Sequence, residues 1–142
     1  MAFFYAVSNG GKKVASQPIE TPRGKKLLMK TYTGSCHCQA ILFEVKCSLE
    51  MSYQCDCSIC SRKNAKMIYA DQHDFTLLRG KDNLSCYQFN TDIAEHYFCK
   101  TCGIYTFHKP RMLPNKYGIN SGCLEGVNAL ELPAKVLHGS AL

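Results

Sequence analysis

A mainly β fold is predicted by three features of the sequence. Ile41, Phe43 and Val45 recur at every second position, which is the period of a half-buried strand. Similar short runs are separated by turn-forming residues, as at 79–83 and 109–111. No stretch keeps a 3.6-residue apolar stripe over three turns, so long helices are not expected. The predicted strands lie near 27–33, 40–46, 66–70, 75–78, 84–89, 94–98, 103–108 and 116–120, with cysteines in the loops and one helical turn after Cys57, through 61–64.

The chain has the size of one domain with a core of its own. It contains 142 residues, of which 46% are hydrophobic. Residues 8–26 are rich in Gly, Pro, Ser and Lys and poor in apolar side chains, as flexible leaders are. We therefore predict a flexible basic N-terminal arm over residues 1–26 and a single folded domain over residues 27–142.

The N-terminal stretch does not have the order of a secretory signal. Its apolar run is six residues long, and the basic residues follow this run instead of preceding it. No segment approaches the roughly 20 apolar residues that span a bilayer. A reducing, cytoplasmic location is predicted, and in that setting clustered cysteines hold metal or perform chemistry more often than they form disulfides.

The basic charge of the chain raises the question of an anionic partner. The formal net charge is +6 at pH 7. Seven bound thiolates and two Zn²⁺ would together lower it by three, to about +3. The basic residues also concentrate in the predicted arm. For these reasons neither nucleic acid nor a membrane is expected as a partner.

Seven of the ten cysteines lie in short groups with metal-ligand spacing. A CxxC pair followed by Gly is half of a zinc ribbon, in which both sulfurs reach one ion about 2.3 Å away. A CxC pair turns both sulfurs to one side only where the backbone kinks, which metal binding can enforce. The isolated Cys47, Cys86 and Cys123 are expected to be packing residues. The groups are Cys36-His-Cys38, Cys55-Asp-Cys57-Ser-Ile-Cys60 and Cys99-Lys-Thr-Cys102-Gly.

The seven sulfurs divide into a set of four and a set of three. A closed set of four thiolates is typical of structural zinc, whereas three protein ligands and an exchangeable position are typical of catalytic zinc. Pairing the CxC at 36–38 with the CxxC at 99–102 gives the four-sulfur cluster, which ties together segments some 60 residues apart. The CxCxxC at 55–60 then forms the three-sulfur cluster. An alternative makes both sites structural, with a fourth ligand to the second from His37, His73, His96 or His108.

These motifs resemble the glutathione-dependent formaldehyde-activating enzyme family, which includes centromere protein V. The resemblance rests on GSCHC at 34–38, CDCSIC at 55–60 and HYFCKTCG at 96–103, and it spans about residues 31–126. It implies an Mss4-like fold, or β-tent, of short antiparallel sheets stapled by two Zn²⁺. By position, Cys36, Cys38, Cys99 and Cys102 would hold the structural zinc, and Cys55, Cys57 and Cys60 the catalytic zinc.

The activity that the resemblance implies is the condensation of glutathione with formaldehyde to S-hydroxymethylglutathione, or a related reaction of a thiol–aldehyde adduct, in the carbon–sulfur lyase class. The partner would be a small-molecule thiol such as glutathione. Because centromere protein V suggests non-enzymatic roles, the alternative is a non-catalytic, zinc-stabilised binding module for a protein or a small molecule.

Residues next to the three-sulfur cluster are candidates for supporting roles. A thiol that enters the open position loses its proton and becomes a nucleophile, or else zinc polarises the aldehyde carbonyl. Three thiolates on one Zn²⁺ leave a net charge of −1, so nearby cations would help. The basic side chains that follow the cluster either give this help or are solvated, and the polar residues inside it either carry protons or shape the turn. These residues are Arg62, Lys63 and Lys66, and Asp56 and Ser58.

Overall fold

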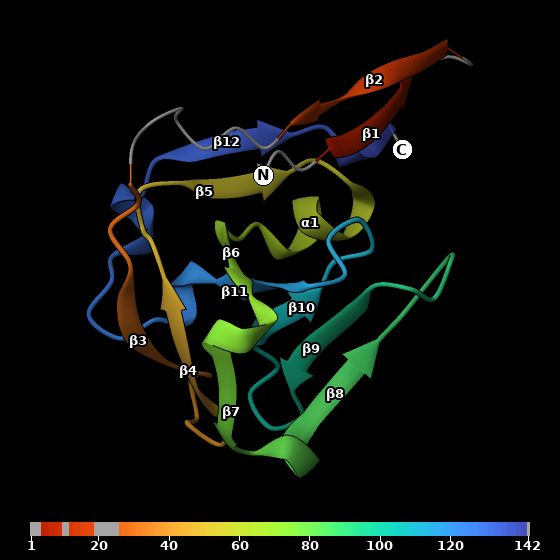
Figure 1. Cartoon of the computed structure of the whole chain (residues 1–142). Helices are drawn as coiled ribbons and strands as arrows, with labels where there is room; N and C mark the ends of the chain where they lie inside the picture. Colours follow the sequence, from red (N-terminus) through yellow and green to blue (C-terminus); the bar gives the residue numbers. More distant parts are fainter. Residues whose placement is uncertain (1–3, 10–11, 19–25, 142) are drawn as a thin grey trace.

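The structure, a computed structural model, describes residues 4–9, 12–18 and 26–141, and it confirms the mainly β fold (Figure 1). The strands are β1 (Phe4–Asn9), β2 (Lys12–Pro18), β3 (Lys30–Ser35), β4 (Leu42–Cys47), β5 (Ser52–Cys55), β6 (Met67–Asp71), β7 (Phe75–Arg79), β8 (Leu84–Tyr87), β9 (Glu95–Cys99), β10 (Tyr105–Lys109), β11 (Lys116–Asn120) and β12 (Ala134–Leu137). The described residues add one α-helix, α1 (Ser58–Lys63), and single 3₁₀ turns, η1 (Gln72–Asp74), η2 (Lys81–Asn83), η3 (Ser121–Cys123), η4 (Ala129–Glu131) and η5 (Gly139–Ala141).

The strands of the described residues form three sheets. The largest has the order β12-β5-β6-β11-β10-β9-β8. It is a mixed sheet, because β12 runs parallel to β5 while the other neighbouring strands run antiparallel to each other. A second, antiparallel sheet has the order β3-β4-β7, and β1 and β2 form a hairpin. This arrangement of small sheets agrees with the predicted Mss4-like fold.

The core lies between the two larger sheets. Along β4, Phe43, Val45 and Cys47 are buried and Glu44 and Lys46 are exposed, so the predicted period of two is confirmed. The ring of Phe43 packs against two aromatic rings from other strands, Phe75 on β7 and Phe107 on β10, at centroid distances of 5.4 and 5.8 Å. Burial of such rings is the main favourable term in folding a domain of this size.

The strand predictions were incomplete at two places. Each of the eight predicted strands is present within a few residues, but within the predicted domain β5 and β12 were missed, whereas β8, which is just as short, was predicted. On β12 the side chains are mostly exposed, so this strand shows no apolar alternation, and it is held by backbone pairing to β5. The placement of all cysteines in loops was also wrong: Cys55 and Cys99 end strands, and Cys60 lies in α1.

The N-terminal arm is described only in part. Strands β1 and β2 pair within the range predicted to be flexible, and residues 1–3, 10–11 and 19–25 lie outside the described residues. The flexible arm over 1–26 and its boundary with the domain therefore stay predictions. In the part of the chain that the structure describes, no helix is long and apolar enough to cross a membrane.

Candidate metal centre and active site

The four-sulfur cluster brings two distant turns together. The sulfurs of Cys36, Cys38, Cys99 and Cys102 all lie within 4.8 Å of one another, and two of the Sγ–Sγ distances, Cys36–Cys38 and Cys38–Cys99, are 3.6 Å. Four sulfurs about 2.3 Å from one ion at the corners of a tetrahedron are about 3.8 Å apart. The donor set and its spacing thus fit a tetrahedral Zn²⁺.

Local backbone geometry aims these sulfurs at one point. In the first turn Gln39 has φ of 64°, and its N–H donates to the Cys36 carbonyl at 3.1 Å. In the second turn Gly103 has φ of 75°, in the left-handed region that glycine adopts most easily. Three N–H groups, from Asn83, Thr101 and Cys102, donate to the Cys99 sulfur at 3.2 to 3.5 Å. Donors to sulfur stabilise the thiolate that a metal binds.

The three-sulfur cluster is built where β5 passes into α1. Cys55 ends the strand, Cys57 is the N-cap of α1, and Cys60 follows one turn later, so all three sulfurs meet within 4.8 Å. Hydrogen bonds with Cys55 and Cys60 lower the pKa of Cys57, and hydrogen bonds with Cys55 and Cys57 raise the pKa of Cys60.

No described histidine completes the three-sulfur cluster. Among the described residues, the group of His, Cys, Asp and Glu donors within 4.8 Å of one another contains these three sulfurs and no fourth donor. His37 and His73 are exposed in other turns, and His96 and His108 are buried in strands. The geometry supports an open position, as in catalytic zinc sites.

Of the three basic residues after the cluster, Lys63 is the one that turns inward. Its Nζ is buried and makes no hydrogen bond in the structure, and it lies 4.2 Å from the centroid of the Tyr105 ring. Burial lowers the pKa of Lys63, and the nearby charge of Cys60 opposes this shift. Arg62 donates to the Ser58 carbonyl, and Lys66 donates to two carbonyls of the segment before β12. Among these three residues, Lys63 is thus the one whose charge interacts with the cluster.

A bulge in β10 places a tyrosine beside this lysine. Tyr105 pairs with Phe98 and Phe107 pairs with Tyr97, so two steps along β10 match a single step along β9. Adjacent residues of β9 point to opposite faces, and therefore Tyr105 and Phe107 do as well. Without the bulge, the tyrosine would share the face of Phe107. The bulge instead directs it to the side of the sheet where Lys63 lies.

Two buried histidines share this side of the sheet. His96 on β9 and His108 on β10 are paired across the strands, with stacked rings 5.5 Å apart. The Nδ1 of His96 lies 2.6 Å from the Tyr105 hydroxyl, whereas the Nδ1 of His108 has no hydrogen-bond partner. Burial lowers the pKa of His96 to about 4. A buried network with unpaired polar atoms is typical of functional sites. No local motif predicts this network, because its residues come from separate strands and from α1.

The segment after β12 covers the three-sulfur cluster. Strand β12 lies beside β5 (Figure 1), and their parallel pairing sets Leu137 opposite Cys55. Asp56, inside the cluster, then accepts from the N–H of Ser140 at 2.8 Å and lies 2.9 Å from the Nδ1 of His138. The Ser140 N–H lowers the pKa of Asp56. Asp56 is thus a tether for the C-terminal segment.

The three isolated cysteines lie outside both clusters. Cys47 and Cys123 are buried, and burial raises the pKa of the Cys47 thiol to about 11 and that of Cys123 to about 12. Cys86 is exposed on β8, and all ten cysteines are free of disulfides. The burial of Cys47 and Cys123 agrees with the expectation that they are packing residues, whereas this expectation was wrong for the exposed Cys86.

Comparison with known proteins identifies the family. Residues 31–138 match the family model of the glutathione-dependent formaldehyde-activating enzyme. The chain belongs to this family. A crystal structure of a Rhodobacter sphaeroides protein, a structural genomics target, is 44% identical, with a TM-score of 0.69, and the match covers 72% of this chain and 99% of that chain.

The family match extends further along the chain than the sequence motifs indicated. It ends at residue 138, beyond the limit of about 126 drawn from the motifs, so β12 lies within the formaldehyde-activating enzyme domain. Both sulfur clusters and the buried His–Tyr–Lys network also lie within it. The match begins at residue 31, so it leaves out the whole of the predicted arm.

Proposed function

We propose that this member of the family is a zinc-dependent carbon–sulfur lyase-type enzyme that joins a small thiol, such as glutathione, to an aldehyde, such as formaldehyde. One observation carries the proposal: three sulfurs with no fourth protein donor among the described residues lie next to the buried ammonium of Lys63. A structural site needs neither the open position nor the buried charge. Both serve a site that accepts an anionic thiolate.

In this proposal Cys36, Cys38, Cys99 and Cys102 hold a structural zinc, and the three-sulfur cluster of Cys55, Cys57 and Cys60 holds a catalytic one. The donor type and spacing of both clusters support this assignment. When bound at the second cluster, zinc supplies a Lewis acid and stabilises the thiolate of an entering thiol. The ammonium of Lys63 offsets the negative charge of three thiolates and attracts the anionic substrate.

The reaction needs a proton at the aldehyde oxygen. As the thiol sulfur bonds to the carbonyl carbon, the C=O electron pair moves to the oxygen, which takes up a proton. The net result moves the proton of the thiol to that oxygen, with no change in oxidation state. We assign the proton donation to the Tyr105 hydroxyl, because it lies 2.6 Å from His96 Nδ1, through which it can be reprotonated. A cytoplasmic setting suits this chemistry, since thiols stay reduced there.

The test is the rate of S-hydroxymethylglutathione formation from glutathione and formaldehyde, with the spontaneous rate subtracted. The zinc-loaded protein is expected to exceed the spontaneous rate, and Cys57→Ser is expected to abolish the excess. Cys86→Ser is the matched control, because this cysteine is exposed and outside both clusters, and full activity is expected. No excess rate with the wild-type protein would overturn the proposal. Retained glutathione binding without turnover would favour the binding module instead.

A further inference from the structure

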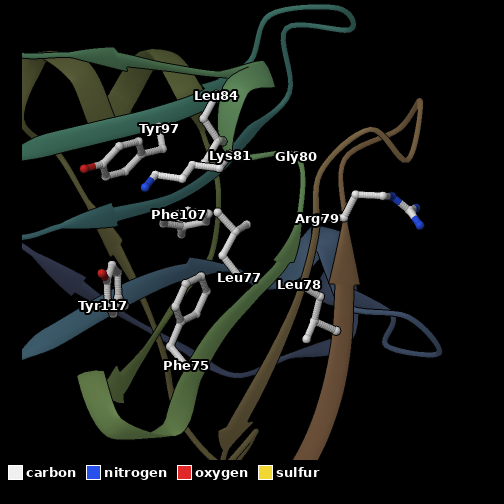
Figure 2. Close-up of a pocket in the computed structure, with 10 residues that line it drawn as sticks. All are labelled: Phe75, Leu77, Leu78, Arg79, Gly80, Lys81, Leu84, Tyr97, Phe107 and Tyr117. Atoms are coloured by element: carbon white, nitrogen blue, oxygen red, sulfur yellow. The ribbon is translucent and has the colours of Figure 1, made fainter.

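A pocket lies on the far side of the sheet from the proposed active site. Its volume is about 650 Å³, and strands β7, β9, β10 and β11 contribute to its walls (Figure 2). Ligand pockets in proteins have volumes of about 300 to 1,000 Å³. Its rings are Phe75, Tyr97, Phe107 and Tyr117. The pocket therefore has the size of a small-molecule site and a largely aromatic wall.

The pocket and the proposed active site use opposite faces of the same two strands. Phe107 pairs with Tyr97, and the next pair along these strands is His108 with His96. Successive residues of a strand point to opposite faces, so the aromatic pair faces the pocket and the histidine pair faces away from it. A ligand in the pocket is thus separated by the sheet from the buried histidine network.

The aromatic rings form a continuous wall. Phe107 lies at its centre, with ring-centroid distances of 4.7 Å to Phe75, 5.1 Å to Tyr97 and 5.8 Å to Tyr117. Phe75 and Tyr117 stack at 4.5 Å with an interplanar angle of 28°. A flat aromatic ligand can add one more ring to such an array by stacking or edge contact.

The charge at the pocket is positive. Its ten lining residues include two cations, Lys81 and Arg79, and no acid. Figure 2 shows Arg79 directed away from the rings, and its guanidinium donates to the Gln39 carbonyl at 2.8 Å. The side chain of Lys81 extends across the pocket toward Tyr97. Within the described residues Lys81 has no ion-pair partner, so its ammonium is available to a ligand anion.

The turn that carries Lys81 is fixed from two sides. Gly80 has φ of 95°, and a Cβ there would be 2.2 Å from the Ala40 carbonyl oxygen, so the turn packs closely on its neighbour. Two residues after Lys81, Asn83 donates to the Cys99 sulfur at 3.2 Å and to the Thr101 hydroxyl at 3.1 Å. The four-sulfur cluster thus holds one wall of the pocket, which reduces the entropy cost of ordering Lys81 around a ligand.

We infer that this pocket binds a flat aromatic carboxylate, with the ring system against the aromatic wall and the carboxylate on Lys81. The size, the ring array and the unopposed cation each support this ligand class. The site is separate from the proposed thiol–aldehyde chemistry and does not depend on it.

The probe is 2-naphthoate, whose fluorescence can be followed directly because the chain contains no tryptophan. Zinc-loaded protein is titrated, and ¹H–¹⁵N spectra locate the site. We expect saturable binding, amide shifts at β7, η2 and β10, about fivefold weaker affinity in Lys81→Gln, and unchanged affinity in Lys135→Gln, an exposed lysine on β12. The neutral analogue 2-naphthalenemethanol should bind more weakly and should not distinguish Lys81→Gln from the wild type.

Several results would overturn the inference. One is the absence of saturable binding, and another is equal affinity in both lysine variants. A third is a set of amide shifts at the three-sulfur cluster instead of the pocket. A fourth is a dimer in sedimentation that buries the aromatic wall, which would make the occupant a second copy of the chain. Unchanged binding in Cys57→Ser keeps the test independent of the proposed enzyme activity.

Discussion

Replacing Lys63 with Met should have opposite effects on zinc binding and on the stability of the metal-free protein. The ammonium is buried, and burial outweighs the charges of the nearby sulfurs in setting its lowered pKa. In the metal-free state, an apolar side chain of similar length removes a desolvated charge. Such a change stabilises a protein by about 1 to 2 kcal/mol, or by about 4 to 8 °C in melting temperature for a domain of this size.

With zinc bound, the same lysine faces a centre of net charge −1. Two unit charges about 4 Å apart attract by about 4 kcal/mol at an effective dielectric constant of about 20. The cost of burying the ammonium offsets more than half of this, which leaves about 1.5 kcal/mol, or about a tenfold difference in zinc affinity. We therefore expect Lys63→Met to weaken zinc binding at one of two sites about tenfold.

The assay is competition for zinc with a chromophoric chelator, together with thermal unfolding of the metal-free protein. Arg62→Gln is the matched control, because it removes a neighbouring cation from the same helix. The Arg62 guanidinium donates to the Ser58 carbonyl on the outside of α1. Equal zinc affinity in the two variants would refute the electrostatic role of Lys63. A melting temperature of metal-free Lys63→Met below that of the metal-free wild type would refute the claim that the buried charge destabilises the metal-free fold.

Three further predictions follow from the same site. Burial lowers the pKa of His96 from 6.5 to about 4, so its neutral form stabilises the fold fully above pH 6.5 and loses this effect as the pH falls toward 4. Between pH 7 and 5, the unfolding free energy of the zinc-loaded wild type, measured in urea, should therefore fall by about 2 kcal/mol more than that of His96→Gln. The control His73→Gln should show the same fall as the wild type. Gly139→Ala would place a Cβ 2.4 Å from the Cys55 sulfur, so we expect one zinc of two to be lost in metal analysis while the fold is kept in circular dichroism; two retained ions would contradict this. Cys102→Ser should instead remove the other zinc and lower the melting temperature by 10 °C or more, since it opens the closed cluster; a shift below about 2 °C would contradict a structural role.

The division of the cysteines could be predicted from the sequence because it depends on local spacing. A CxC or CxxC pair sets the distance between its own sulfurs through a few backbone angles, and a set of seven ligands has few divisions that satisfy zinc. Strand β4 was predictable for a similar reason, since its alternation reports a single buried face. The grouping of sulfurs in space therefore agrees with the grouping by spacing.

The surroundings of the three-sulfur cluster could not be predicted in the same way. The position of Tyr105 depends on a bulge, and the stacking of His96 on His108 depends on register between two strands. Neither has a local sequence signal. The tether from Ser140 to Asp56 spans 84 positions and depends on β12, a strand too short and too exposed to be detected. Selecting Lys63 from among three basic neighbours likewise required knowing which way α1 faces.

The bulge in β10 also bears on how this fold can acquire or lose chemistry. Because two steps along β10 match one step along β9 between Tyr105 and Phe107, a regular β10 of the same length would place the tyrosine on the face of Phe107. The aromatic core behind Phe107 would remain in place, while the proposed proton donor would leave the histidine side. Loss of this one bulge would thus be enough to separate metal binding from the proposed catalysis in this scaffold, which offers a simple evolutionary route between zinc enzymes and zinc-stabilised binding proteins.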